Sequence, residues 1–285
     1  MNSSEPRASI ATELARGTAE LRGLPSSRLD AELLLAWLLG RSRAWLLAHA
    51  EQSLAPAIAT RFRAQLARRA QGEPLAYISG RREFWSLDLE VNPAVLVPRP
   101  ETELLVERAL ALLPDRTADV ADLGTGSGAI ALACASERPQ WRITATDVSP
   151  AALAVATLNA TRLSLGNIRF LQGSWYEPLG AEHFDLLLSN PPYVAADDPA
   201  LADPALRHEP QTALVAANQG LADLSALVAG APAHLRPGGW LLLEHGAGQA
   251  RVVAEMLVSQ TWAHVRCHAD LAGHDRVTEA QLRRD

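Results

Sequence analysis

The segment Ser189–Tyr193 (SNPPY) follows an apolar run, Phe184–Leu188, and has residue types that can hold a flat NH2 group. The Asn190 side-chain oxygen and the Pro191 carbonyl can each accept one N–H bond, which would fix such a group and favour positive charge growing on its nitrogen. The prolines stiffen the backbone, and Tyr193 offers a planar face. A rigid loop with its tyrosine in the core is the alternative. The predicted catalytic residues are Asn190, Pro191 and Tyr193, and the predicted acceptor-binding residues are Asn190, Pro191, Pro192 and Tyr193.

A glycine-rich loop, Gly124–Gly128 (GTGSG), follows an earlier apolar run and precedes an apolar helix. Glycines let the backbone bend sharply and let a cofactor approach the main chain closely. The GxGxxA reading that ends at Ala129 is a loose dinucleotide pattern, whereas the tighter GxGxG spacing is common in methyltransferases that bind S-adenosylmethionine. Asp147, 19 residues beyond Gly128, is placed to accept hydrogen bonds from ribose hydroxyls in either case. A glycine turn that only packs helix on strand is the alternative.

After about residue 100, strand-like and helix-like segments alternate along the chain, and this alternation predicts the fold that positions these residues. Short apolar strands are expected at Asp119–Leu123, Arg142–Thr146, Ile168–Leu171, Asp185–Leu188 and Trp240–Leu243, separated by helices at Glu101–Leu113, Gly128–Glu137, Pro150–Leu165, Leu221–Leu235 and Gln249–Leu257. Such alternation predicts an α/β fold with a doubly wound, mainly parallel sheet covered on both faces. Ligands bind such sheets outside the carboxyl ends of the strands, so Asn190 and the glycine loop should lie together there.

The first 98 residues lack this alternation of strands and helices. Residues 1–80 are expected to form a small helical-bundle domain, with helices at Ser9–Arg22, Ser27–Leu39, Ala44–Ala50 and Ala55–Ala70. Ser27 is expected to cap the second helix and Gly40 to end it. Residues 81–98 alternate like a β-hairpin linker with its turn at Asn92-Pro93. Residues 99–285 then form the α/β domain.

Composition narrows the class of protein. All 26 basic residues are arginine, which excludes chemistry that needs a lysine amine, and the formal net charge is −6. Two cysteines, Cys134 and Cys267, form neither a disulfide framework nor a metal motif, so we expect no metal. The start lacks a signal pattern, and no apolar run approaches the roughly 20 residues of a membrane span. We expect a cytoplasmic monomer with no membrane partner.

Several further motifs together resemble one known family. They are Gln71–Gly80 (QGEPLAYISG), Val97–Glu103 (VPRPETE), the glycine loop, Asn190–Tyr193, Glu209-Pro210 with Thr212–Leu214, and Leu243–Gly246 (LEHG). Over essentially its whole length the chain resembles the release-factor glutamine methyltransferases, class I enzymes with a Rossmann-like fold. These methylate the glutamine side-chain amide in the GGQ motif of peptide chain release factors, using S-adenosyl-L-methionine and leaving S-adenosyl-L-homocysteine. The residues that the resemblance assigns to the cofactor are Gly124, Thr125, Gly126, Ser127, Gly128, Asp147, Trp175 and Asn190.

Two other substrates remain open on the motif alone: a glutamine of a ribosomal protein, and the adenine amino group of nucleic acid. The isoelectric point near 5.8 weighs against direct nucleic-acid binding. The resemblance also implies that Trp175 packs near the adenine. Many relatives have an acid just before that position, whereas this chain has Ser174.

Docking of the protein substrate is the last expectation. Residues 61–82 contain six arginines and one acid, and we hypothesise that they bind an acidic surface of the release factor. A solvated helix face is the alternative. The six are Arg61, Arg63, Arg68, Arg69, Arg81 and Arg82.

Overall fold

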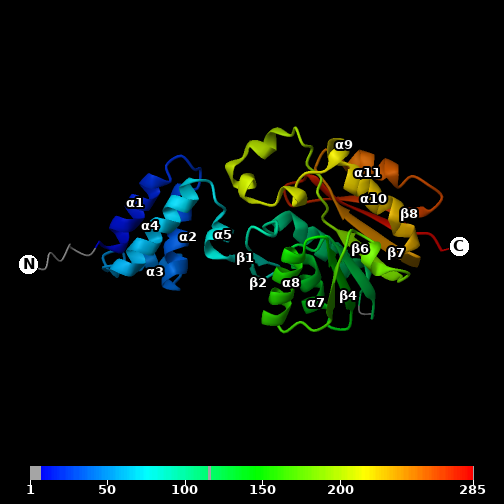
Figure 1. The fold of residues 1–285 in the computed structure, drawn as a ribbon, viewed down its shortest axis with the longest axis horizontal. Helices are drawn as coiled ribbons and strands as arrows, with labels where there is room; N and C mark the ends of the chain where they lie inside the picture. Colours follow the sequence, from blue (N-terminus) through cyan, green and yellow to red (C-terminus); the bar gives the residue numbers. More distant parts are fainter. Residues whose placement is uncertain (1–7, 115–116, 285) are drawn as a thin grey trace, which may run out of the picture. The chain divides into compact units, whose positions relative to one another are not determined.

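The first of two units in this computed structural model comprises Met1–Gly80 together with Asp203–His208; across the chain the structure describes residues 8–114 and 117–284. Its helices are α1 (Ile10–Glu20), α2 (Ser27–Leu39), α3 (Arg43–Ala48), α4 (Pro56–Ala70) and α5 (Leu75–Ser79), and η4 (Pro204–His208) joins them from far along the chain (Figure 1). Apolar side chains of these helices, among them Leu35, Phe62 and Leu66, form one buried cluster. The helical domain therefore has a core of its own.

The ends of these helices agree with the sequence in part. Gly40 ends α2 in the left-handed conformation with a φ of 60°, as expected. The predicted cap at Ser27 is wrong, because Ser27 is the first helical residue and the N-cap, Ser26, makes no side-chain capping bond. Asp30, three residues into the helix, is buried and accepts a 2.7 Å hydrogen bond from Arg69 Nε instead. A tertiary ion pair has replaced the local capping pattern.

Most of the arginines between residues 61 and 82 have partners. Arg63 pairs with Glu13, Arg68 with Glu73 and Arg69 with Asp30. In the other unit, Arg81 lies 3.4 Å from both Asp88 and Glu90, and Arg82 donates to the Pro98 carbonyl. Four of the six arginines are thus paired with acids, three of them with acids outside residues 61–82, which weakens the idea of an arginine docking strip.

The second unit, Arg81–Ala202 with Glu209–Asp285, begins with a hairpin of β1 (Arg81–Phe84) and β2 (Leu87–Glu90). Its turn is Trp85-Ser86, with φ of 52° and 60°, so the predicted turn at Asn92-Pro93 is wrong. Two consecutive positive φ angles give the twist that a two-residue hairpin turn needs. Such turns usually contain asparagine or glycine, and this one contains neither. Asn92 instead makes a local turn, accepting from the Ala94 amide at 2.9 Å.

A seven-stranded sheet forms the body of this unit. Its order is β5 (Ile168–Gln172), β4 (Arg142–Asp147), β3 (Asp119–Leu123), β6 (Phe184–Ser189), β7 (Leu235–Glu244), β9 (Asp275–Leu282) and β8 (Trp262–Ala269). The first five are parallel, and β9 runs antiparallel to both neighbours. The predicted fold, a mainly parallel sheet after a helical domain and a hairpin, is confirmed. The final pair of strands, β8 and β9, was not foreseen.

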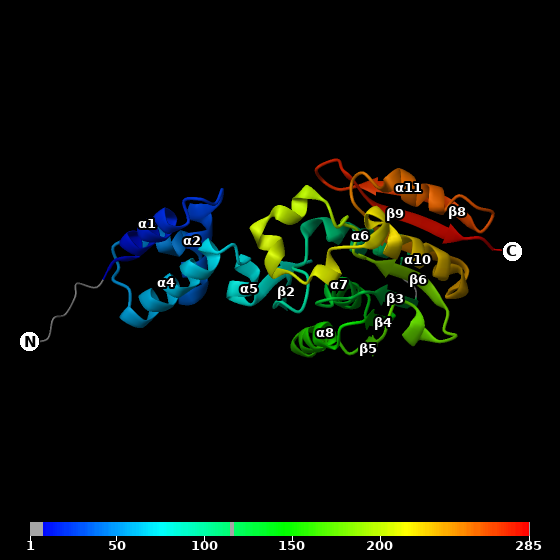
Figure 2. The same ribbon diagram turned by 45° about the horizontal axis from the view of Figure 1, so that its top comes forward.

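Helices cover both faces of the sheet (Figure 2). On one face lie α6 (Glu103–Leu112), α7 (Ala129–Glu137) and α8 (Pro150–Arg162), and on the other lie α10 (Ala222–Gly230) and α11 (Ala250–Met256). Residues of β3 alternate between the two cores, since Val120 packs on the first face and Ala121 on the second. The predicted helix Leu221–Leu235 runs too far, because Leu235 already begins β7.

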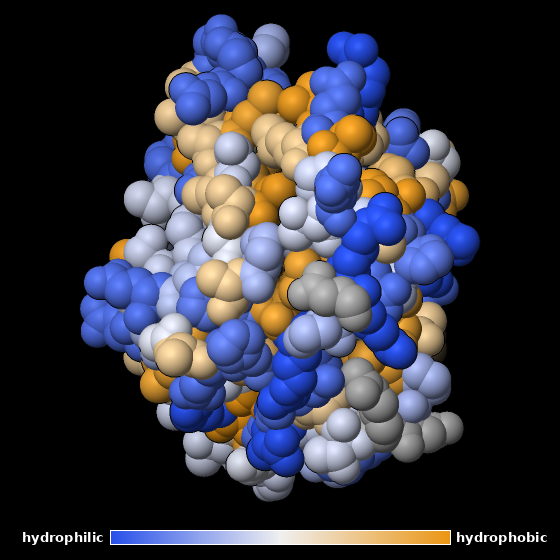
Figure 3. Space-filling model, turned by 90° about the vertical axis from the view of Figure 1, so that its right-hand side faces the viewer, coloured by the Kyte–Doolittle hydropathy of each residue, from blue (hydrophilic) through white to orange (hydrophobic). Residues whose placement is uncertain are grey.

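Shorter elements complete the chain. They are α9 (Ala217–Gly220), η1 (Pro100–Thr102), η2 (Glu177–Leu179), η3 (Pro199–Ala202), η5 (Gln211–Ala213) and η6 (Ala231–Ala233). The face shown in Figure 3 mixes hydrophilic and hydrophobic side chains, as protein surfaces do. Within the described residues, no helix is both long and apolar enough to cross a bilayer.

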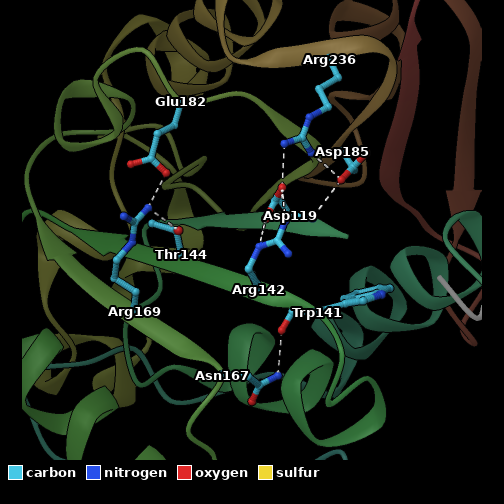
Figure 4. Close-up of polar contacts among 9 residues, drawn as sticks. All are labelled: Asp119, Trp141, Arg142, Thr144, Asn167, Arg169, Glu182, Asp185 and Arg236. Atoms are coloured by element: carbon cyan, nitrogen blue, oxygen red, sulfur yellow. Dashed lines mark hydrogen bonds and ion pairs between the residues drawn. The ribbon is translucent and has the colours of Figure 1, made fainter. Parts of the chain in front are cut away.

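The amino-terminal ends of the strands are joined by ion pairs (Figure 4). Asp119 of β3 lies between Arg142 of β4 and Arg236 of β7, each 2.6 Å from a carboxylate oxygen, and Arg236 also reaches Asp185 of β6 at 2.6 Å. Two acidic and two basic side chains, one from each of four strands, therefore join the strands at the end of the sheet opposite the carboxyl ends.

Candidate active site

A cavity of about 450 Å³ lies at the carboxyl ends of the parallel strands. Its wall includes eight of the predicted residues, which come from the loops after β3, β4, β5 and β6. They are Gly124, Thr125, Gly126, Ser127, Asp147, Trp175, Asn190 and Pro192. Gly128, Pro191 and Tyr193 adjoin these residues in sequence without lining the wall. Residues distant in sequence thus meet at one edge because parallel strands end there.

The glycine loop is held by a buried acid beneath it. Asp122 is fully buried at the end of β3, and its Oδ2 atom accepts from the Thr125 hydroxyl at 2.6 Å and from the Ala131 amide at 3.2 Å. Burial raises the pKa of Asp122 to about 7. Sequence reasoning assigned this residue no role, although a polar residue at the end of an apolar strand was a signal.

The three glycines of the loop have positive φ, and two are restricted further. A Cβ on Gly124 would stand 3.1 Å from the Trp175 ring, and one on Gly128 would stand 2.9 Å from Leu132. Gly126 faces open space. Gly128, the N-cap of α7, is therefore needed for the packing of that helix. Gly124 and Gly126 have no side chains, so the backbone itself lines the cavity there.

Asp147, the last residue of β4, faces the cavity. Its Oδ2 atom accepts from the Gly126 amide at 2.9 Å, and its Oδ1 atom accepts from the Ser149 amide at 2.8 Å. Each carboxylate oxygen can accept a second bond. The side chain is therefore fixed by the backbone and can still accept hydrogen bonds from a pair of hydroxyl groups.

Trp175 is held in the cavity by an acid that the sequence did not point to. Its backbone has a φ of 44°, and its side chain hydrogen-bonds to Asp223 near the start of α10. Asp223 also lines the cavity, and burial raises the pKa of its carboxyl group. Ser174 lines the same wall, so a carboxylate is present close to the position where Ser174 lacks one.

Asn190 is the polar side chain at the end of β6. Its Nδ2 atom donates to the Thr102 hydroxyl at 3.1 Å. The preceding residue, Ser189, is buried and donates to the Leu123 carbonyl at 2.6 Å, which joins the ends of β6 and β3. The asparagine and the glycine loop are thereby fixed to one another.

Tyr193 is not among the residues that line the cavity. Its hydroxyl donates to Glu244 Oε1 at 3.2 Å, and its carbonyl accepts from Gln249 Nε2 at 3.0 Å. Glu244, the last residue of β7, is 1% exposed, and burial raises its pKa to about 7. Burial likewise raises the pKa of Tyr193, so its hydroxyl stays protonated. Glu244 was quoted in a motif without a role, and its place at the end of a strand was the signal.

Two of the other family motifs, Val97–Glu103 and Glu209-Pro210 with Thr212–Leu214, contribute residues to the cavity wall. Arg99, which lines the wall, donates to Glu209 Oε1 at 2.6 Å, and the second oxygen of Glu209 accepts from the Val97 amide at 3.0 Å. Pro210, Thr212 and Ala213 follow and also line the wall. Among the residues that the structure describes, no three His, Cys, Asp or Glu side chains are grouped to hold a metal ion.

Comparisons with known proteins agree with this arrangement. The PrmC N-terminal domain model matches residues 13–80, and the methyltransferase small domain model matches residues 100–259. A release factor glutamine methyltransferase from Xylella fastidiosa is 52% identical over 88% of this chain and 92% of its own length. One from Salmonella typhimurium is 47% identical over 91% and 94%. The chain belongs to the release factor glutamine methyltransferase family. The resemblance predicted from the sequence motifs is confirmed.

Solved structures extend the likeness of fold beyond this family. The hMettl16 catalytic domain has a TM-score of 0.56 at 16% identity, with 80% of this chain and 82% of that chain covered. A methyltransferase from Pyrococcus furiosus has a TM-score of 0.54 at 20% identity, with 78% and 99% covered. The release factor glutamine methyltransferase family thus shares its class I fold with methyltransferases of distant sequence.

Proposed function

We propose that this chain transfers the methyl group of S-adenosylmethionine to the side-chain amide nitrogen of the glutamine in the GGQ motif of peptide chain release factors, leaving S-adenosylhomocysteine. The observation that carries this proposal is that Asn190 and the glycine loop border one cavity. A donor on the loop would then lie beside an amide held by Asn190. Relatives at 47–52% identity that are named for this activity support the same substrate.

The chemistry requires orientation more than acid or base. An amide nitrogen is a poor nucleophile, because its lone pair is delocalised with a rotational barrier of about 18–20 kcal/mol. The Asn190 Oδ1 atom and the Pro191 carbonyl would accept the two N–H bonds and align the nitrogen with the methyl group. The N–C bond forms as the C–S bond breaks, and the methylated nitrogen releases its proton to water.

The cofactor part of the proposal follows the cavity wall. Gly124–Ser127 would contact the donor through their backbone, Asp147 would accept its ribose hydroxyls, and Trp175 would cover its adenine. We include Asp223 in this proposal, because it lines the wall and binds Trp175. Its carboxylate has acceptor capacity left for the adenine amino group, the role for which Ser174 has no acid.

Docking of the release factor is assigned to the helical domain. Leu29, Leu33 and Trp37 lie at intervals of four residues on α2 and are 40%, 40% and 42% exposed. This apolar stripe is a better candidate surface than the arginines of residues 61–82, most of which are paired. A cytoplasmic location, where release factors act, and a monomeric state remain part of the proposal.

A methyl-transfer assay tests the function. The protein is incubated with labelled S-adenosylmethionine and, separately, a purified release factor, its GGQ glutamine-to-alanine variant, ribosomes and DNA. We expect label on the release factor that retains its GGQ glutamine, and on none of the other three samples. Label on ribosomal protein or on DNA would favour one of the two other substrates, and equal labelling of the alanine variant would exclude the GGQ glutamine as acceptor.

A further inference from the structure

Three polar side chains, Thr102, Glu244 and Tyr193, are linked to one another next to Asn190. The Asn190 Nδ2 atom donates to Thr102 Oγ1, the Thr102 hydroxyl lies near enough to the Glu244 carboxyl group to lower its pKa, and Tyr193 donates to Glu244 Oε1. Thr102 is 4% exposed and Glu244 is 1% exposed, so bulk water does not satisfy these groups. Thr102 is the N-cap of α6, yet its side chain makes no capping bond there. The hydroxyl is used between Asn190 and Glu244 instead.

We propose that Thr102 and Glu244 are positioning residues that fix which end of the Asn190 side-chain amide faces the cavity. This inference rests on the proposed function and adds to it a reason why the acceptor oxygen points the right way.

The direction follows from the donors and acceptors available. A hydroxyl has one hydrogen to donate, and an ionised carboxylate can only accept. If Thr102 donates to Glu244, its oxygen can only accept from Asn190, which must therefore present its NH2 end to Thr102. The Asn190 Oδ1 atom is then left on the opposite side, where a substrate NH2 group would find it.

A neutral Glu244 removes this constraint. Its carboxyl hydrogen can be donated to Thr102, whose own hydrogen can then be donated to the Asn190 Oδ1 atom. The asparagine amide would turn over and present an NH2 group to the NH2 group of the substrate, with no acceptor between them. The charge on Glu244 therefore decides whether the acceptor site exists.

The surroundings of Glu244 make this charge sensitive to pH. Burial is the main cause that raises its pKa to about 7, and Glu101 acts in the same direction. Arg276 and the hydrogen bonds from Thr102 and Tyr193 oppose the rise. Burial lowers the pKa of His245, the next residue, which hydrogen-bonds to Thr278. Turnover should accordingly be about half-maximal near pH 7, reach its plateau well above that pH and fall below it as Glu244 gains a proton.

The test compares substitutions of matched shape. Thr102→Val keeps the volume and removes the hydroxyl, and Thr102→Ser keeps the hydroxyl. We expect kcat to fall about 30-fold to 100-fold in Thr102→Val, with the KM for S-adenosylmethionine within about threefold, and Thr102→Ser to restore most of kcat. Thr144→Val, a buried threonine at the opposite end of the sheet, reports the general effect of losing a buried hydroxyl. Equal losses in Thr102→Val and Thr144→Val would overturn the proposal.

A second measurement needs no substrate. Asparagine labelled with ¹⁵N gives side-chain amide resonances, and those of Asn190 should shift with pH near 7 in the wild-type chain but not in Glu244→Gln. No pH dependence in the wild-type chain would overturn the role of Glu244. If the wild-type chain fails to methylate any release factor, the proposed function fails, and this spectrum still decides on the positioning of Asn190.

Discussion

The carbonyl oxygen of Tyr193 lies 2.1 Å from the point where a Cβ on Gly220 would stand. Gly220 also has a φ of 79°, and it follows two non-glycine residues, Asn218 and Gln219, that share the left-handed conformation. The end of the SNPPY segment therefore packs against Gly220, the last residue of α9, and this contact leaves no room for a side chain at residue 220.

Gly220→Ala should displace Tyr193 and disturb Asn190. The clash with backbone cannot be relieved by a rotamer change, and the positive φ adds strain, so we expect a loss of about 1–3 kcal/mol in the free energy of unfolding and at least a tenfold loss of kcat. Chemical denaturation and the methyl-transfer assay measure these. Gly248→Ala is the control, because nothing lies within 4 Å of a Cβ there. Similar behaviour of the two variants would show that the contact with Tyr193 is unimportant.

Asn190→Ala should lower kcat by about 100-fold or more without unfolding the chain, because it removes an acceptor of the substrate amide. The measurement is turnover at saturating substrate, alongside thermal denaturation. Asn167→Ala is a matched control, since Asn167 bonds the Trp141 carbonyl at the far end of the sheet (Figure 4). Near-normal turnover in Asn190→Ala would contradict our assignment of the acceptor site.

Asp223→Ala should weaken cofactor binding by about tenfold, consistent with loss of one charge-assisted hydrogen bond. Calorimetric titration with S-adenosylhomocysteine and with its inosine counterpart, which lacks the adenine amino group, separates recognition from packing. The wild-type chain should prefer the adenine compound, and the variant should bind both alike. A preference that survives in Asp223→Ala would assign adenine recognition to another group.

Asp119→Asn should destabilise the chain by about 1 kcal/mol at neutral pH. Arg142, followed by Arg236, holds the pKa of Asp119 below its usual value. The stabilisation is therefore complete above the pKa that Asp119 has in the unfolded chain, about 4. It is lost as the pH falls through the lower pKa that Asp119 has in the folded chain. Denaturant unfolding should show the difference between variant and wild type at about pH 7 but not well below pH 4. In contrast, Arg251→Gln breaks an exposed pair with Glu255 and should have little effect.

Leu33→Glu should raise the KM for the release factor by about tenfold while leaving the KM for S-adenosylmethionine unchanged, because it places a charge in the apolar stripe of α2. Val258→Glu, at an exposed apolar side chain of the other unit, is the control. If both substitutions leave the KM for the release factor as it is, the stripe does not dock the substrate.

The sequence predicted the main fold and the meeting of Asp147, Asn190 and the glycine loop, because strand periodicity places all three at one edge of a parallel sheet. The roles assigned to these residues remain predictions. Asp223 and Thr102 could not be found in this way. Thr102 lies 88 residues from Asn190, and at the start of a helix a threonine is most simply interpreted as a cap. The hairpin turn was misplaced because Trp85-Ser86 lacks the residues that usually mark one.

Asn159 joins the hairpin to the glycine loop. Fully buried in α8, it accepts from the Glu90 amide at 2.7 Å and donates to the carbonyls of Glu90 and Ser127, each at 3.0 Å. Separating the two segments would leave several buried polar groups without hydrogen-bond partners, at a free-energy cost of about 1–3 kcal/mol each. Opening of one segment should therefore entail opening of the other. A ligand that rigidifies the glycine loop would then also slow hydrogen exchange at the Glu90 amide, although Glu90 precedes the glycine loop in the sequence by more than 30 residues.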